Sequence, residues 1–391
     1  MEARDKVTGS AKYTVDIHHD GQLEGVILRS QLAHARIGEL DLAPARAMPG
    51  VSAAISLLGD DRIVRYVGEP IAAVAAKDRK TALAAIAAIR INSERLPSAI
   101  GLDEARKAGC AGRVRKIRAA RRPATSPKAA ARRRRGKEIS ADRRRPSHKK
   151  PKKVRSWVDG AREANNPLLV EGTFRTGTQS HACLEPHAAV ARFDGDRLTV
   201  HVSTQAVFHV MELIAKRYKL DHRQGARDRR PCRRRLWLQG QRLAWRRPPR
   251  SNWRARAKAP VRVAYDRHEE LSVTGYRPAT EVKIALLPSE QGELKALSLT
   301  AHADTGAATN STIAALARLI YPAEAKELAD YDVISNLPAG AAFRGPGGPP
   351  MAFALEQAID EAALRMKVDP IALAQTLGSR SQPPAALRLG I

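Results

Sequence analysis

The 391-residue chain has few cysteines and no long apolar segment. Cys110, Cys183 and Cys232 stand far apart, which excludes a disulfide framework and any CxxC pair for zinc or an iron–sulfur cluster. Such cysteine use favours a reducing compartment. No run approaches the ~20 apolar residues that span a bilayer, and the amino-terminal residues lack the apolar centre of a signal peptide. The sequence therefore indicates a cytoplasmic protein.

The net positive charge of the chain comes from two segments. There are 68 Lys and Arg residues against 40 Asp and Glu residues, a formal net charge of +28. Residues 113–155 hold 20 basic and 2 acidic residues, and residues 217–258 hold 16 and 2. The remainder is mildly acidic, as in an ordinary soluble enzyme. Because both segments lack apolar periodicity, we expect a disordered basic linker over residues 101–157 and a scrambled basic insert over 217–258.

Apolar runs and turn residues predict a small α+β domain over residues 1–100. The runs "EGVILRS", "VSAAISL" and "GEPIAAVAA" are bounded by Gly, Pro or charged residues, as strands usually are. A helix is expected after the last run, because Asp78 can cap its first turn and Ala82, Ile86 and Ile89 recur at helical spacing.

Hairpins and helices are expected again after residue 158. Two alternating runs flank Asp194 and Gly195, a pair that tolerates the positive φ of tight β turns. A second hairpin is expected around residues 289–292. Between them, "AVFHVMELIAKRYKL" carries apolar residues at helical spacing and predicts a helix.

A Gly/Pro-rich loop, "PAGAAFRGPGGPP", leads into a last predicted helix. Its buried stripe is expected to consist of Leu355, Ile359, Ala362 and Met366. Asp369-Pro370 should end this helix, because proline lacks the amide hydrogen that a continuing helix needs. Residues 374–391 are expected to form an unstructured tail.

Several segments, taken in order, resemble one enzyme family. "KVTGSAKYTVDI", "AHARIGELDLAPARAMPGVSAAIS" and "RYVGEPIAAVAA" are similar to the a/b hammerhead domain of xanthine dehydrogenases and aldehyde oxidases. "GTQSHACLEPHAAVA", "STQAVFHV", "ADTGA" and "PAGAAFRGPGGPPMAFALEQAIDEAA" resemble successive parts of the molybdopterin-binding domain of the same large subunits. The expected fold is α+β: a hammerhead domain over 1–100, then a partial mixed α/β molybdopterin-binding domain over 158–373.

The resemblance implies oxidation of an aldehyde or a nitrogen heterocycle at a molybdenum–molybdopterin cofactor, with water as the oxygen source. Electrons would leave through iron–sulfur clusters to FAD. No iron–sulfur or dinucleotide fingerprint occurs in this chain, so both cofactors are expected on partner subunits. The family's general-base glutamate belongs to a carboxy-terminal half that the chain lacks, so no catalytic residue is assigned.

Four residues are assigned to the cofactor by this resemblance. Gln179 matches a glutamine that donates a hydrogen bond to an oxygen ligand of molybdenum, and Phe343, Arg344 and Gly345 match a loop that approaches the cofactor. The alternatives are a surface glutamine and a plain connector. Arg277 is assigned to substrate orientation, with an ordinary surface arginine as the alternative.

His181, Glu185 and His187 have spacing that could suit zinc. The family resemblance favours another role, because it repeats the pattern "H..LEPH" as a hydrogen-bonded scaffold near the cofactor. We therefore assign no metal site from the sequence.

The segment "CRRRLWLQGQ" stands where the family carries a glycine-rich GGGFG loop. If Arg233 to Gln239 are encoded by CGG CGG CGG CTT TGG CTC CAA, reading one nucleotide later gives Gly-Gly-Gly-Phe-Gly-Ser and, with a following G, Lys. The hypothesis is that this segment and residues 113–149 are out-of-frame translations.

Two other functions stay open. The two basic segments could bind nucleic acid, because clustered Lys and Arg bind phosphate groups. Against this, aromatic residues are only 4% of the chain, and no known nucleic-acid-binding module is recognisable in the sequence. The chain could also be an inactive truncated fragment of the family. Substrate identity and oligomeric state are not determined by the sequence.

Overall fold

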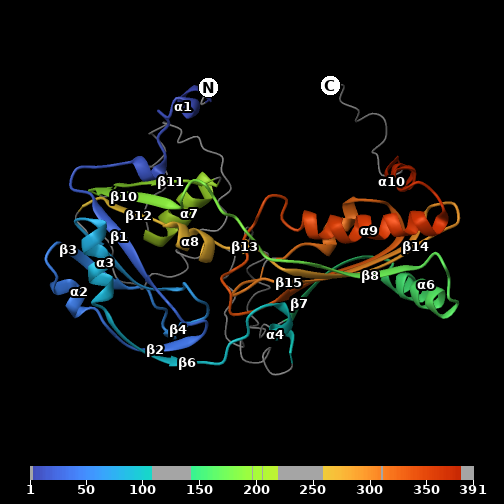
Figure 1. Cartoon of the computed structure of the whole chain (residues 1–391), viewed down its shortest axis with the longest axis horizontal. Helices are drawn as coiled ribbons and strands as arrows, with labels where there is room; N and C mark the ends of the chain where they lie inside the picture. Colours follow the sequence, from blue (N-terminus) through green and yellow to red (C-terminus); the bar gives the residue numbers. More distant parts are fainter. Residues whose placement is uncertain are drawn as a thin grey trace. The chain divides into compact units, whose positions relative to one another are not determined.

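The computed structural model describes residues 3–107, 142–195, 197–204, 206–218, 259–309 and 311–379. The chain divides into two compact units, each assembled from three segments (Figure 1). The first unit comprises Met1–Ser98, Ser180–Tyr276 and Asn336–Phe343, and the second comprises Ala99–Gln179, Arg277–Ser335 and Arg344–Ile391. None of the helices in the described ranges is long and apolar enough to cross a membrane.

A six-stranded sheet in the order β11-β10-β12-β1-β5-β3 organises the first unit. Its strands are β1 (Leu23–Arg29), β3 (Val51–Ser56), β5 (Pro70–Ala76), β10 (Ala188–Asp194), β11 (Arg197–Val202) and β12 (Val261–Ala264). A smaller sheet in the order β4-β2-β6 contains β2 (Ala35–Asp41), β4 (Ile63–Val64) and β6 (Arg90–Arg95). The helical segments are α1 (Ala3–Val7), η1 (Thr14–Asp16), α2 (Ala43–Ala47), α3 (Arg79–Ala87), α7 (Val207–Tyr218) and α8 (Arg267–Ser272).

Helix α3 begins and packs as its sequence predicts. The Asp78 carboxylate accepts a hydrogen bond from the backbone N–H of Thr81 at 2.7 Å, which satisfies one of the unpaired donors of the first turn. This bond lowers the pKa of Asp78. Ala82 and Ile89 are buried in the hydrophobic core to which β3 and β5 also contribute side chains. The predicted hairpin at Asp194 and Gly195 is confirmed, because β10 and β11 pair antiparallel.

The sheet of the first unit joins segments that are distant in sequence. Strand β1 pairs parallel with β12, with Leu23 opposite Val261 and Gly25 opposite Val263. The predicted division placed residues 1–100 in one domain and 158–373 in the next. In the structure, strands from both ranges form one sheet, because β12 completes the edge that β1 leaves unpaired.

A five-stranded sheet in the order β7-β16-β15-β14-β8 organises the second unit. Its strands are β7 (Asp142–Lys149), β8 (Val170–Thr176), β14 (Thr280–Pro288), β15 (Leu294–Asp304) and β16 (Ala323–Val333). The helical segments are α4 (Leu102–Arg106), α6 (Pro151–Glu163), η4 (Ala314–Leu319), α9 (Gly348–Met366) and α10 (Pro370–Ser379). Two short strands, β9 (Gln179–Ser180) and β13 (Tyr276–Arg277), form a separate two-stranded sheet.

Helices cover both faces of the five-stranded sheet. Strand β14 directs Ile284 and Leu286 into the core shared with α9, and it directs Ala285 and Leu287 into the core shared with α6. This alternation follows from the two-residue period of a strand. A strand covered on both faces has few exposed positions, and in β14 and β15 only Lys283 and Lys295 are exposed. Figure 1 shows α9 lying along these strands.

The second hairpin and the last long helix agree with the sequence. Strands β14 and β15 pair antiparallel across the turn that contains Ser289 and Gly292. In α9, Leu355, Ile359 and Ala362 are buried, as predicted, and Met366 packs against the same core.

Two expectations of disorder are wrong where the structure describes the chain. The predicted linker over 101–157 contains α4, β7 and the first half of α6, and residues 108–141 lie outside the described residues. Helix α6 forms because Val154, Val158 and Ala161 share one buried face, a spacing hidden among the basic residues.

The second expectation was an unstructured tail over residues 374–391. It is wrong as far as Ser379, where helix α10 ends. Pro370 begins α10 after α9 has ended at Met366, because proline suits a first helical turn and the Asp369 carboxylate accepts from the N–H of Ala372 at 2.9 Å. Residues 380–391 lie outside the described residues.

His302 gives the second unit a dependence on pH. Its ring stacks on Tyr331 with the centroids 4.7 Å apart. Burial, followed by the positive charges of Arg106 and Lys283, lowers the pKa of His302 to about 4, against an opposing effect of Glu281. Because the unfolded chain takes up this proton near pH 6.5 and the folded chain does not, stability is present above that pH and is lost as the pH falls toward 4.

We expect His302→Gln to reduce the acid destabilisation between pH 6.5 and pH 4 by on the order of 1 kcal/mol, after allowance for solvent screening. Urea unfolding of the full chain at a series of pH values measures this. His209→Gln is the control, because His209 is exposed on α7 and its replacement should leave the profile unchanged. Equal profiles for wild type and His302→Gln would contradict the assignment.

Candidate functional site

The loop that precedes α9 carries three of the predicted cofactor residues. Arg344 and Gly345 are exposed, and Phe343 is half-buried. Gly345 and Gly347 both have left-handed backbone conformations, with φ of 63° and 76°. The loop turns tightly into α9, because the N–H of Gly348 donates to the carbonyl oxygen of Gly345 at 3.0 Å.

Gly347 lies directly against the chain segment before η4. A Cβ atom at this position would stand 1.8 Å from the carbonyl oxygen of Thr312. The left-handed conformation and the lack of space both require glycine here. At the next position, Gly348, a Cβ would meet nothing within 4 Å.

Arg277 is buried beneath this loop, with 7% of its surface exposed. The alternative prediction of an ordinary surface arginine is therefore wrong. The Nη2 group of Arg277 donates to the backbone carbonyl oxygen of Arg344. Burial lowers the pKa of the Arg277 guanidinium. A buried guanidinium that holds a loop carbonyl fixes the path of that loop.

Gln179 is exposed on β9, three residues after the end of β8. Its strand pairs with β13, the strand that ends at Arg277. An exposed carboxamide can donate to a ligand without adding charge.

The predicted family segment "ADTGA" forms a turn at the end of β15. The Asp304 carboxylate accepts from the hydroxyl of Ser335 at 2.5 Å and from the N–H of Gly306 at 3.1 Å. Thr305 donates to the carbonyl oxygen of Val333. Burial raises the pKa of Asp304, and the two hydrogen bonds oppose this rise. These contacts give the segment a structural role in the second unit.

His181 anchors the part of the loop that belongs to the first unit. Its two ring nitrogens lie 3.1 Å from the carbonyl oxygen of Gly275 and 2.8 Å from that of Ala342. Its ring centroid is 5.2 Å from that of Phe343. Gly275 permits this packing, because a Cβ there would lie 2.5 Å from the Cβ of Ala341. His181 therefore has the scaffold role that the sequence suggested.

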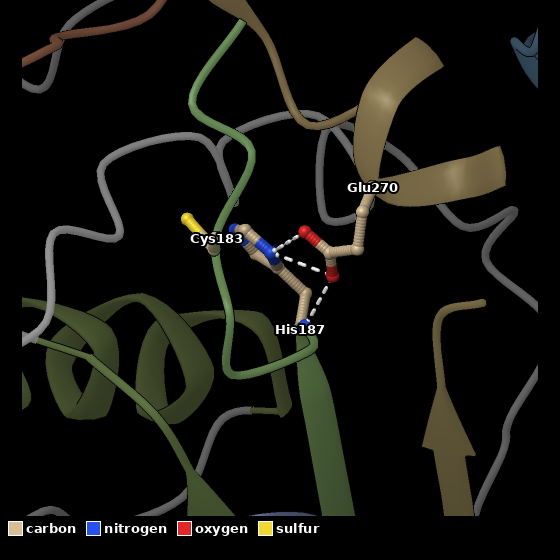
Figure 2. A group of neighbouring side chains, drawn as sticks. All are labelled: Cys183, His187 and Glu270. Atoms are coloured by element: carbon tan, nitrogen blue, oxygen red, sulfur yellow. Dashed lines mark hydrogen bonds and ion pairs between the residues drawn. The ribbon is translucent and has the colours of Figure 1, made fainter. Parts of the chain in front are cut away.

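Glu185 and His187 have different partners from each other. The Glu185 carboxylate accepts from the hydroxyl of Ser203, which also contacts Thr14. His187 bonds through Nδ1 to both carboxylate oxygens of Glu270, at 2.7 and 2.9 Å (Figure 2). The spacing of His181, Glu185 and His187 thus does not produce a common centre among the described residues.

Glu270 was not predicted from the sequence. It lies on α8, 83 residues after its partner His187, and only 1% of its surface is exposed. The one local signal near it is a capping box, in which Asp266 accepts from the N–H of Glu269 and Glu269 accepts from that of Asp266. That box predicts a helix start and carries no information on the distant histidine.

Comparison with known families and structures defines the class of protein. A family model described as "Molybdopterin cofactor-binding domain" matches residues 147–224 and 254–376. A second, "Aldehyde oxidase and xanthine dehydrogenase, a/b hammerhead domain", matches residues 8–59. The predicted resemblance is confirmed: the chain belongs to the molybdopterin-binding subunits of the xanthine dehydrogenase and aldehyde oxidase family.

Individual relatives agree with this assignment. The aldehyde oxidoreductase molybdenum-binding subunit PaoC of Escherichia coli (strain K12) is 27% identical over 94% of this chain and 48% of its own length. The nicotinate dehydrogenase large molybdopterin subunit of Eubacterium barkeri is 26% identical over 95% of this chain and 86% of its own. The chain thus spans about half the length of the first of these relatives and most of the second.

Solved structures confirm the fold class, including the amino-terminal hammerhead domain. Quinoline 2-oxidoreductase from Pseudomonas putida 86 superposes with a TM-score of 0.71 at 21% identity, over 95% of this chain and 48% of that one. The aldehyde oxidoreductase from Desulfovibrio gigas gives a TM-score of 0.70 at 22% identity, over 98% and 43%.

The residues present fit an anionic cofactor. Arg344 and Gly345 are exposed at the amino-terminal end of the 19-residue helix α9, where the helix dipole favours negative charge. Pro349 and Pro350 have no amide hydrogen, so donors must come from the loop itself. Gln179 adds a neutral donor.

Gly347→Ala should unfold or displace the loop, because the new methyl group meets the Thr312 carbonyl and the backbone is left-handed. We expect a loss of about 2 kcal/mol or more in the free energy of unfolding, measured by urea denaturation. The matched control is Gly348→Ala, which has open space and a helical backbone and should change stability by less than about 1 kcal/mol. Equal effects for the two substitutions would contradict the proposed contact.

Proposed function

We propose that this chain is the molybdenum-binding part of a molybdenum hydroxylase that oxidises an aldehyde or a nitrogen heterocycle with water as the oxygen source. The observation that carries the proposal is the family match, which contains Gln179, Arg277 and the loop from Phe343 to Gly345 within its two ranges. The names of the relatives, an aldehyde oxidoreductase subunit and xanthine dehydrogenases among them, support the substrate class.

When bound, the molybdenum–molybdopterin cofactor would supply the redox chemistry. The residues of this chain would hold and orient it. Gln179 would donate its amide to an oxygen ligand of the metal, and the backbone of Arg344 and Gly345 would approach the cofactor closely because Gly345 has no side chain.

Arg277 would act through the loop. Its bond to the Arg344 carbonyl fixes the backbone at the residue that approaches the cofactor. The predicted role in substrate orientation is retained in this indirect form: the arginine would hold the loop that borders the substrate, and Phe343 would provide an apolar wall.

Partner subunits belong to the proposal. Iron–sulfur clusters and FAD would reside on other chains, since this sequence has neither CxxC cysteines nor a dinucleotide fingerprint. The remaining half of the longer relatives, with the general-base glutamate, would come from further polypeptide. A relative of similar length is a large molybdopterin subunit by name, which supports a divided arrangement. The singly placed cysteines favour a cytoplasmic location.

Gln179→Ala tests the cofactor contact. In the assembled complex, loss of one hydrogen bond to the cofactor should lower aldehyde turnover with an artificial electron acceptor by about 10- to 100-fold. Molybdenum content, measured by mass spectrometry of the metal, should fall much less. Gln291→Ala is the control, because Gln291 is exposed in the turn between β14 and β15.

Wild-type protein without molybdenum, produced in a host that makes the cofactor, would contradict the proposed function and favour an inactive fragment. Wild-type activity in Gln179→Ala would contradict only the role of that residue.

The basic segment after α7 is proposed to be translated out of frame. The family match stops at residue 224 and resumes at 254, so the interruption coincides with the run from Arg233 to Gln239. These residues lie outside the described part of the chain. The two matched ranges on either side support a frame that is lost and then restored.

Resequencing of the gene and peptide mass spectrometry of the purified protein test this. We expect either a corrected sequence or peptides that contain Gly-Gly-Gly-Phe-Gly in place of the arginine run. Peptides that match residues 229–247 as printed, from a verified gene, would refute the hypothesis.

A further inference from the structure

Three metal-ligating side chains converge in the first unit, on residues to which the proposed cofactor site assigns no role. One ligand atom each of Cys183, His187 and Glu270 lies within 4.8 Å of the other two. Figure 2 shows the Cys183 sulfur and the Glu270 carboxylate on opposite sides of the His187 ring. His187 and Glu270 are buried, and Cys183 is half-buried. No other such group occurs in the ranges that the structure describes.

The surroundings of this cluster are rich in buried negative charge. Glu270 is 1% exposed, and Glu185, 8% exposed, also acts electrostatically on Cys183. One carboxylate oxygen of Glu185, Oε2, is buried and has no hydrogen-bond partner. An ionised carboxylate with an unsatisfied oxygen is costly inside a protein unless a cation lies nearby.

Local structure holds the three side chains in place. Glu270 lies on α8, whose first turn is closed by the capping box of Asp266 and Glu269. The Glu270 carboxylate accepts from the backbone N–H of His187 and bonds to Nδ1 of its ring. Arg267 of the same helix donates to the carbonyl oxygen of Cys183. The loop that carries Cys183 and the helix that carries Glu270 are thus tied together before any ligand arrives.

We propose that Cys183, His187 and Glu270 bind a zinc ion that is separate from the molybdenum cofactor. Thiolate, imidazole and carboxylate together match the ligand preference of zinc, whereas calcium and magnesium take oxygen ligands. Three protein ligands leave a fourth, tetrahedral position for water. Zinc bonds are about 2.0–2.3 Å long. The three ligand atoms, which lie within 4.8 Å of one another, would therefore move closer together, and the ion would replace the hydrogen bond between His187 Nδ1 and Glu270.

Direct metal measurement on the full chain tests the site without any need for molybdenum or activity. Protein stripped with a chelator and titrated with zinc should bind one ion tightly, and its unfolding temperature should rise. Titration with cobalt(II) should give the near-ultraviolet charge-transfer band of a cobalt–thiolate bond. This band reports a sulfur ligand, so a merely structural role of the cysteine would not produce it.

Cys183→Ser should abolish the cobalt band and weaken zinc binding by more than about 100-fold, and Glu270→Gln should weaken it by at least about 10-fold. Two matched controls should bind zinc as wild type does: Cys232→Ser, which removes another cysteine, and Glu290→Gln, which removes an exposed carboxylate. Far-ultraviolet circular dichroism checks that each variant is folded.

Wild-type protein that binds no zinc above the level of Cys183→Ser would overturn the proposal, as would a cobalt band that survives this substitution and disappears in Cys232→Ser. Neither result would affect the proposed molybdenum function, which depends on Gln179 and the loop before α9.

Discussion

A side chain cannot stand at position 347, because its Cβ would lie 1.8 Å from the Thr312 carbonyl oxygen. This lack of space fixes the loop before α9 against the segment before η4. That segment is itself fixed, since the Asp330 carboxylate accepts from the N–H groups of Ile313 and Ala314 at 2.9 and 2.8 Å. The exposed backbone of Arg344 and Gly345 is thereby presented by a rigid support.

The support extends into the sheet of the second unit. Asp330 lies on β16, and β16 pairs along its whole length with β15, whose far end holds the Asp304 turn. Helix α9 then covers the β14 and β15 face with Leu355 and Ile359. A site built on packed strands and a long helix keeps its geometry better than one built on loops alone. This one sheet connects the "ADTGA" turn with the support of the loop before α9.

The first unit is organised by buried polar groups that need partners. His187 and Glu270 satisfy each other, and His181 lies between two carbonyl oxygens. Such groups would be costly without these contacts. They tie the strand that begins at residue 188 to helix α8 and to the segment around Ala342, so two of the three segments of the first unit, Ser180–Tyr276 and Asn336–Phe343, are held together.

Local patterns in the sequence determined the elements whose causes are local. Asp78 capped the expected helix, Asp194 and Gly195 formed the expected turn, and the stripe around Leu355 gave the expected buried face. The ordered motifs also determined the family. Dense positive charge hid helix α6 and strand β7, because composition outweighed the three-residue apolar face of α6. Tertiary structure alone decided that β1 pairs with β12, that Arg277 is buried, and that Glu270 meets His187 beside Cys183. These contacts join residues far apart in the chain, and strand order, which local periodicity does not encode, brings them together.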